Sequence, residues 1–171
     1  MKRNRRPESE RPSDWWADYE EIKDLSPFEL SGGMKRRVAI AGVIAMDPKI
    51  LILDEPTAGL DPSAHRDILA MVRRIHEEMG IILIFVSHNM ADIAELSDRV
   101  MVMSGGKVVL EGTPAEVFSQ GDWLSEMGLG VPPAKEIVDL IKKREPEFIS
   151  EALSTDEAAR DIRHYLGESD G

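Results

Sequence analysis

The chain has 171 residues, of which 42% are hydrophobic and only 5% are aromatic, so it can form one globular domain with a mostly aliphatic core. Its formal net charge of −11 argues against a nucleic-acid-binding protein. It has no cysteine, which excludes disulfides and thiolate metal sites, and its longest strongly apolar run, IILIFV, is too short to cross a bilayer.

Residues 1–16 are predicted to form a disordered basic arm. The opening MKRNRRPESERPSD is the one basic cluster of an acidic chain, and acids and prolines dilute it. Such a composition cannot bury enough apolar surface to offset the entropy lost on folding. An arm that binds nucleic acid or a membrane surface is the alternative interpretation.

Helix and strand signals begin at Leu30. Ser31 can cap a helix through GGMKRRVAIAGVIAM, which should stop before Asp47-Pro48. The run KILILD follows as a strand. Because its apolar residues do not alternate with polar ones, this strand is expected to be buried on both faces.

A second helix and a second strand follow. Asp61 is expected to cap the helix, with Pro62 in its first turn, and Gly80 should end it. Apolar residues at helical spacing predict one buried stripe, formed by Ile68, Val72, Ile75 and Met79. The run IILIFVS is then a second buried strand, and His88 lies just past its end.

A short helix over MADIAEL precedes two short apolar runs, RVMVMS and KVVLEG, which predict a hairpin that turns at Gly106-Lys107. This is the only Gly-Lys pair in the chain. A phosphate-binding loop needs Gly, four residues, then Gly-Lys-Ser/Thr. Val108 follows the pair, and Met101 stands where the first glycine should be. The 171 residues therefore contain no such loop.

Strands that alternate with helices predict an α/β fold with a mostly parallel sheet. We expect this domain to span residues 17–121. After it the chain becomes acidic, Pro132-Pro133 interrupts it, and AKEIVDLIKKR and DEAARDIRHYL predict helices, the last capped by Ser154 or Thr155. Residues 122–171 are therefore expected to form a small acidic, helical C-terminal tail.

Two adjacent acids end the first strand. Asp54 could bind Mg²⁺ directly or through water, and Glu55 could polarise a water that attacks a phosphoryl group. Acids at the C-terminal end of a strand lie where α/β folds bind ligands. The structural alternative is that each acid caps a helix or pairs with an arginine.

Two further features fit phosphate chemistry. A neutral His88 could hydrogen-bond a γ-phosphate oxygen or the attacking water, although a lone histidine after a strand is often structural. The run LSGG places the Ser31 hydroxyl and the amides of Gly32 and Gly33 at a helix N-terminus, an anion-binding arrangement. The alternative is a plain helix start.

In this order and spacing, LSGG, LILDEPTAGLD and SH resemble the second half of an ABC-transporter nucleotide-binding domain, a P-loop NTPase domain. Residues 30–34 match its signature motif, residues 50–54 its Walker B strand and residues 58–61 its D-loop. The stretch DYEEIKDLSPFELSGGMKRRVAIAGVIAMDPKILILDEPTAGLDP is similar to the ATPase subunits of energy-coupling-factor (ECF) transporters. So are VVLEGTPAEVFS and the acidic tail.

The resemblance implies an ATP hydrolase that uses ATP and Mg²⁺ to drive uptake of a vitamin or a transition-metal ion. It implies the catalytic residues Glu55 and His88, the metal ligand Asp54, and the nucleotide contacts Ser31, Gly32, Gly33 and Asp61. In this family two subunits sandwich two ATP molecules, and the signature motif of one subunit contacts the ATP held by the other.

The resemblance also implies partners and a location. The partners would be a second ATPase subunit, identical or different, a transmembrane coupling protein and a substrate-binding membrane subunit, with no nucleic acid. The tail would help the two ATPase subunits pair. The protein would be cytoplasmic and peripheral on the inner face of the cell membrane.

The chain departs from the family in two places. Met34 stands where the signature usually has Gln, and a modest effect is expected. The family's first half, with its phosphate loop (Walker A), has no counterpart in these residues. The isolated chain is therefore expected to be inactive. The strands IILIFVS and RVMVMS should also lose the strand that lies between them in this family. The alternatives are a non-catalytic pairing or regulatory module that donates its signature to a full-length partner, and a truncated product without function.

Overall fold

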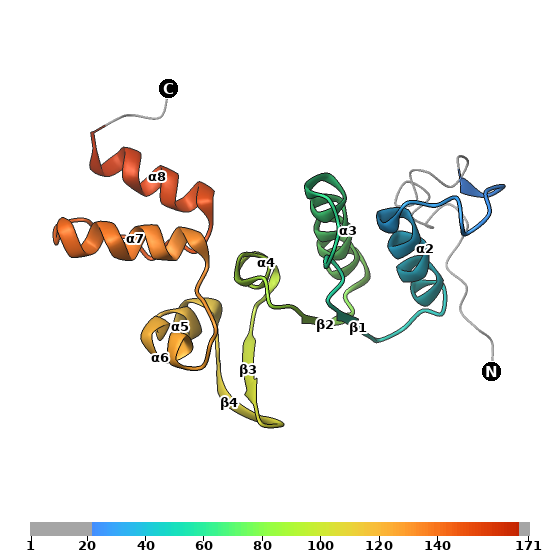
Figure 1. Cartoon of the computed structure of the whole chain (residues 1–171), viewed down its shortest axis with the longest axis horizontal. Helices are drawn as coiled ribbons and strands as arrows, with labels where there is room; N and C mark the ends of the chain where they lie inside the picture. The colour runs from blue at the N-terminus through green and yellow to red at the C-terminus, as the bar shows by residue number, and fades with distance from the viewer. Residues whose placement is uncertain (1–21, 168–171) are drawn as a thin grey trace. The chain divides into compact units, whose positions relative to one another are not determined.

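The computed structural model describes residues 22–167, so the predicted basic arm lies outside the described residues (Figure 1). The chain divides into two compact units, Met1–Ile84 and Phe85–Gly171, and each unit is described by itself. Among residues 22–167, helices and strands alternate along the first part of the chain, and the predicted α/β class is confirmed. None of the helices in this range is long and apolar enough to span a bilayer.

The first unit contains α2 (Gly32–Ile44), β1 (Ile50–Asp54), α3 (Pro62–Met79) and the start of β2 (Ile82–Val86). Both helices begin at the predicted caps, because the Ser31 hydroxyl accepts a hydrogen bond from the Met34 N–H and the Asp61 carboxylate accepts two from the first turn of α3. The predicted stripe of α3 is largely confirmed: Ile68, Val72 and Ile75 are fully buried and Met79 is half-buried. Helices α2 and α3 lie side by side (Figure 1).

Strands β1 and β2 form a two-stranded sheet, joined through α3. The Ile82 N–H donates to the Lys49 carbonyl at 3.0 Å, which brings the starts of the two strands together in a parallel arrangement.

The expectation that both strands are buried on both faces is wrong for the described chain. Leu51 and Leu53 are buried, whereas the side chain between them, Ile52, is 63% exposed. Strand β2 also alternates, and Ile82 is 61% exposed. The continuous apolar pattern is typical of strands covered on both faces, but residues 22–167 cover only one face of β1.

The second unit begins with α4 (Met90–Leu96), β3 (Val100–Ser104) and β4 (Lys107–Gly112). The predicted hairpin is confirmed, since β3 and β4 pair antiparallel, but its turn lies one residue earlier than predicted, because Lys107 already pairs with Ser104 as the first residue of β4. Gly105 and Gly106 form the turn with φ of 55° and 75°, a combination that favours glycine at both places. In the described chain β2 pairs with β1 and β3 with β4, and the shared neighbouring strand that the family resemblance implies for β2 and β3 stays a prediction.

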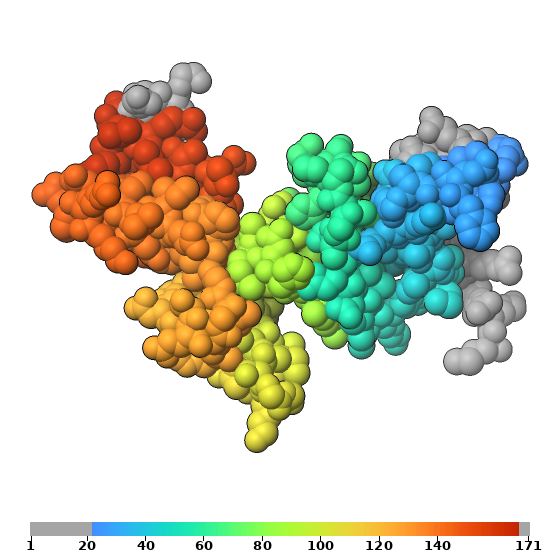
Figure 2. Space-filling model, viewed as in Figure 1, coloured from blue at the N-terminus to red at the C-terminus, as the bar shows by residue number. Residues whose placement is uncertain are grey.

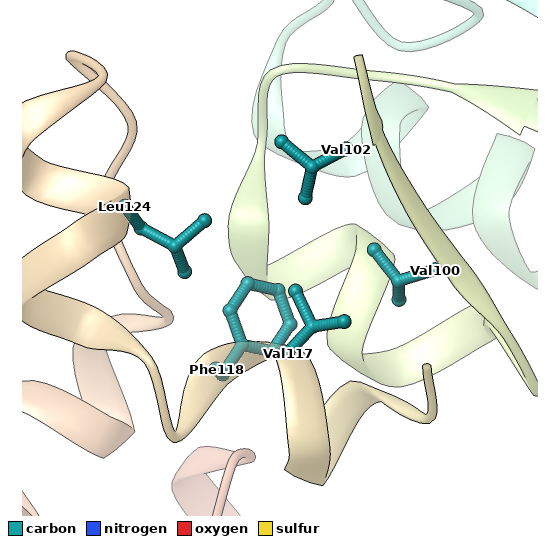
Figure 3. Packing of buried hydrophobic residues seen from close by; sticks show 5 residues of the cluster. All are labelled: Val100, Val102, Val117, Phe118 and Leu124. Atoms are coloured by element: carbon teal, nitrogen blue, oxygen red, sulfur yellow. The ribbon is translucent and has the colours of Figure 1, made fainter. Parts of the chain in front are cut away.

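The hairpin packs against α5 (Pro114–Phe118) and α6 (Gly121–Glu126). Figure 3 shows the centre of this core, where side chains from β3, α5 and α6 turn toward one another: Val100, Val102, Val117, Phe118 and Leu124. Helix α5 is held at its start by a capping box, in which Thr113 and Glu116 each bind the other's backbone N–H.

Helices α7 (Pro133–Arg144) and α8 (Thr155–Tyr165) pack together as one body at the C-terminal end (orange to red in Figure 2). Their own core contains Val138 and Phe148, and the Phe148 ring meets the edge of Tyr165 with centroids 5.3 Å apart. Ser154 caps α8, one of the two predicted caps. Helix α6 belongs to the hairpin core, so the tail of residues 122–171 stays a prediction as a separate domain.

The contact between α2 and α3 predicts opposite effects for two glycine substitutions on α2. A Cβ on Gly33 would lie 3.0 Å from the Ala64 Cβ, which is fixed to the backbone of α3, so we expect Gly33→Ala to push the helices apart and lower the free energy of unfolding by about 1–2 kcal/mol. A Cβ on Gly42 would meet nothing within 4 Å, so Gly42→Ala should raise the free energy of unfolding by about 0.5–1 kcal/mol.

Urea unfolding followed by circular dichroism measures both variants against the parent chain. Gly42→Ala is the matched control, because it makes the same chemical change in the same helix. Equal stabilisation by the two substitutions would contradict the close packing of α2 on α3.

Candidate functional site

Two helix N-termini lie side by side in the first unit. A Cβ on Gly32 would lie 3.7 Å from Leu60 Cδ2, just before α3, and Gly33 approaches Ala64 in the first turn of α3. The first amides of a helix have no partner within the helix, and together with the helix dipole they favour a bound anion. The predicted signature residues and the predicted D-loop are therefore brought together in one place.

The Ser31 hydroxyl has a capping role that leaves its proton available. Its oxygen accepts from the Met34 N–H at 3.2 Å, and Ser31 and Gly32 are both exposed. Because a hydroxyl can accept and donate at once, Ser31 can cap α2 and still donate to an incoming phosphate oxygen. Gly33 is buried against α3, so of the two glycines only Gly32 lies open at the helix start.

Asp61 is positioned by the start of α3. Its Oδ1 accepts from the Ser63 N–H at 2.9 Å and from the Ala64 N–H at 3.0 Å. The hydrogen bonds from Ala64 and Ser63, in that order of importance, hold the pKa of the Asp61 carboxyl below its usual value of 3.8. The structure thus gives Asp61 a helix-capping role, and its predicted contact with nucleotide stays a prediction.

The predicted acidic pair lies where β1 ends. Asp54 is the last residue of the strand and is exposed, whereas Glu55 is half-buried. The backbone of Glu55 has φ of 46°, in the left-handed region that L residues rarely adopt. The chain therefore turns sharply at Glu55, directly after the strand that carries Asp54.

An arginine of α2 holds this turn, and the sequence prediction missed it. Arg36 Nη1 donates to the carbonyl oxygens of Glu55 at 2.8 Å, Pro56 at 2.6 Å and Ala58 at 3.4 Å. The sequence signal was a run of three basic residues, Lys35-Arg36-Arg37, within an otherwise apolar helix. That signal predicts a polar contact across the helix, but it names no acceptor.

His88 belongs to the second unit. It is exposed and lies between the end of β2 and Asn89, whose side chain caps α4 by accepting from the Ala91 and Asp92 N–H groups. The Asn89 N–H donates to the Ser87 hydroxyl at 3.0 Å, so hydrogen bonds on either side of His88 hold the backbone. The other predicted site residues lie in the first unit.

The side chains near the end of β1 can be compared with those that usually bind Mg²⁺. Within residues 22–167, no group of three or more His, Cys, Asp or Glu side chains is arranged to hold a metal ion. Mg²⁺ commonly binds one or two carboxylates and completes its shell with water and substrate phosphates. The single exposed carboxylate of Asp54 fits that mode.

Comparison with known proteins decides the family. A model of the ABC transporter family matches residues 13–58, which include the signature residues and the Walker B strand. The ATP-binding protein EcfA2 of an energy-coupling factor transporter from Clostridium perfringens is 56% identical over 127 residues, 74% of this chain and 45% of that protein. The chain belongs to the ABC-transporter ATP-binding family. The resemblance to ECF-type subunits is confirmed.

Two further relatives support the assignment of this chain to the ABC-transporter family. EcfA2 from Caldanaerobacter subterraneus subsp. tengcongensis is 51% identical over 146 residues, 85% of this chain and 51% of that protein. A solved structure of cbiO1 from Clostridium perfringens, described as part of the ABC transporter complex cbiONQ, matches with a TM-score of 0.57 and 36% identity. That match covers 84% of this chain and 53% of cbiO1. The chain thus spans about half the length of the relatives that it matches.

The capping role of Asp61 predicts a pH dependence. Its pKa is lowered in the folded chain, so the charged carboxylate stabilises α3 above about pH 4 and loses this effect as the pH falls through the lowered pKa. The stability advantage over Asp61→Asn, which keeps an acceptor but does not titrate, should be constant from about pH 7 to pH 5 and shrink below about pH 4.

Two measurements check this prediction. The carboxyl ¹³C shift of Asp61 gives its pKa directly, and thermal unfolding of both chains across pH gives the difference in stability. Using the difference cancels the titration of Glu116 and Glu157, whose pKa values are also lowered by capping hydrogen bonds. A midpoint for Asp61 at or above 3.8 would contradict the capping contacts.

Proposed function

We propose that this chain supplies the signature and Walker B half of the ATP-binding subunit of an ECF-type importer, which couples ATP hydrolysis to uptake of a vitamin or transition-metal ion. The observation that carries the proposal is the first unit's arrangement, in which the exposed start of α2 at Ser31 and Gly32 lies against the D-loop. Relatives named as EcfA2 and a relative from the cbiONQ complex support it.

The roles proposed for Ser31 and Gly32 agree with their exposure, whereas Gly33 is buried against α3. The Ser31 hydroxyl and the amides of Gly32 and Gly33 would donate to phosphate oxygens of an ATP held by a second subunit. Glu55 would polarise the attacking water as a general base, and Asp54 would ligate Mg²⁺. Bound Mg²⁺ supplies positive charge that offsets the charge developing on the transferred phosphoryl group.

His88 and Asp61 complete the proposal. An imidazole at the end of β2 can donate to a γ-phosphate oxygen, which is the role proposed for His88. Asp61 would contribute through the turn that it fixes at the start of α3, beside the signature glycines.

The phosphate loop that ATP binding needs lies outside these 171 residues, because they contain no Gly-Lys-Ser/Thr sequence. We therefore propose that the isolated chain does not hydrolyse ATP. The proposed assembly contains a second ATPase subunit, a transmembrane coupling protein and a substrate-binding membrane subunit, and lies at the inner face of the cell membrane. Nucleic acid is not proposed as a partner, because the net charge is −11.

A non-catalytic module is the second candidate function. Ser31 and Gly32 are exposed, so this chain can present its signature to a full-length ATPase partner without using its own acids. In that case Ser31 would matter for turnover, and Asp54 and Glu55 would not.

Substitution of the acidic pair tests the leading proposal in an assembly with a polypeptide that supplies the phosphate loop. Glu55→Gln should leave ATP binding intact and slow hydrolysis by about 10²-fold or more, because an amide keeps the size of the side chain but cannot act as a base. Asp54→Asn should weaken Mg²⁺-dependent binding instead. The measurements are single-turnover hydrolysis and nucleotide affinity, and near-parental turnover in both variants would mean that the pair has another role.

Substitution of the signature serine tests the second candidate. In a co-purified pair with a full-length partner, Ser31→Arg places a bulky side chain where phosphate must approach and should abolish hydrolysis at the partner's site while the partner still binds ATP. Met34→Gln is the control, because the Met34 contact to Ser31 uses only its backbone N–H. Turnover and nucleotide stoichiometry of the pair are measured, and unchanged turnover with the arginine rules out a donated signature.

A further inference from the structure

The turn after β1 is held by a side chain from a different element. Arg36, half-buried on α2, donates through Nη1 to the carbonyls of Glu55, Pro56 and Ala58. These acceptors lie 19 to 22 residues further along the chain, so the contact is tertiary. A guanidinium is planar and always charged, and its fixed donors suit several carbonyl oxygens gathered in one turn.

The turn needs such support because its backbone is unfavourable. Glu55 has φ of 46°, although it is neither glycine nor asparagine. Non-glycine residues persist in this region only where the surrounding structure determines them. The Glu55 carbonyl accepts from Arg36 and also from the Ala58 N–H at 3.2 Å, so two donors fix the peptide that follows the strained residue.

We propose that Arg36 is a positioning residue, which fixes the backbone of Glu55 and thereby the direction in which the Glu55 carboxylate leaves the chain. The inference rests on the proposed role of Glu55 as general base. Arg36 would also link the signature motif to the turn at Glu55, because α2 carries Arg36 about one turn beyond Ser31 and Gly32. The helix that presents the phosphate donors thus holds the turn that presents the base.

The neighbouring arginine provides the matched control. Arg37 lies on the same helix, but it pairs with Asp67 of α3 at 3.9 Å, with side chains that are 32% and 57% exposed. Exposed pairs at this distance contribute little to stability. Arg36→Lys and Arg37→Lys make the same chemical change one residue apart, and the first removes the planar donor that bonds the carbonyls of the turn. Arg36→Met removes the charge as well.

The first experiment uses the full chain and needs no ATP. Amide hydrogen exchange is followed by NMR at Ala58, whose N–H bonds the Glu55 carbonyl, and at Leu60, whose N–H bonds the Thr57 carbonyl. Arg36→Lys should speed exchange at both amides by about tenfold or more, and Arg36→Met by at least as much, because the loss of a charged donor loosens the turn. Amides of α3 and α7, and both turn amides in Arg37→Lys, should change by less than about twofold. Unchanged exchange at Ala58 in Arg36→Met overturns the proposal.

The second experiment asks whether Arg36 acts through Glu55. In the assembly with a loop-bearing polypeptide, Arg36→Lys should lower kcat about tenfold or more and leave the KM for Mg²⁺-ATP within about twofold. In a Glu55→Gln background it should lower kcat no further, because the base is already lost. An equal fall of kcat in both backgrounds overturns positioning through Glu55.

The two experiments fail separately. If Glu55→Gln alone leaves turnover unchanged, Glu55 is not the general base, and the proposal that Arg36 positions a general base is wrong as well. The exchange result then decides by itself whether Arg36 fixes the turn. If Glu55→Gln slows hydrolysis but Arg36→Lys changes neither exchange nor kcat, the proposed function stands and the role of Arg36 is refuted.

Discussion

The first unit depends on the close approach of α2 to the start of α3. Glycine is favoured at residue 33 because a Cβ there would lie 3.0 Å from the Ala64 Cβ, and the same face of α2 brings Gly32 near Leu60 of the D-loop. Once the helices are this close, Arg36 reaches the turn after β1 and Arg37 reaches Asp67. Helix α2 thus places the signature residues beside the D-loop and also carries the arginine that binds the turn at Glu55.

The residues that start helices also supply the candidate ligands. Ser31 and Asp61 are both helix caps, and the side-chain oxygen of each accepts hydrogen bonds from backbone N–H groups. The consequence differs because a hydroxyl keeps a proton to donate, whereas an ionised carboxylate has none. Ser31 can thus donate to a phosphate oxygen while it caps α2, whereas the bonds of Asp61 stabilise the start of α3.

The first sheet has one open face in the described chain. Strands β1 and β2 keep the unbroken apolar sequence of strands that are covered on both faces, yet Ile52 and Ile82 are more than half exposed in the described chain. The chain also spans about half of each relative. The sequence predicted the two strands correctly but not their burial. Whether a strand face is buried depends on what packs against it, and the sequence of the strand alone does not determine that.

Local rules in the sequence determined the helix starts at Ser31 and Asp61 and the hairpin of β3 and β4, because caps and tight turns need only residues a few positions apart. They left the cap of α8 open between Ser154 and Thr155 and put the turn one residue too late. The order of the motifs likewise determined the family. Only the tertiary structure decided that Arg36 binds the turn at Glu55 and that Glu55 adopts a positive φ. The Arg36 contact joins residues about 20 positions apart, and the unusual φ belongs to a residue type that rarely adopts it, so neither follows from local sequence rules.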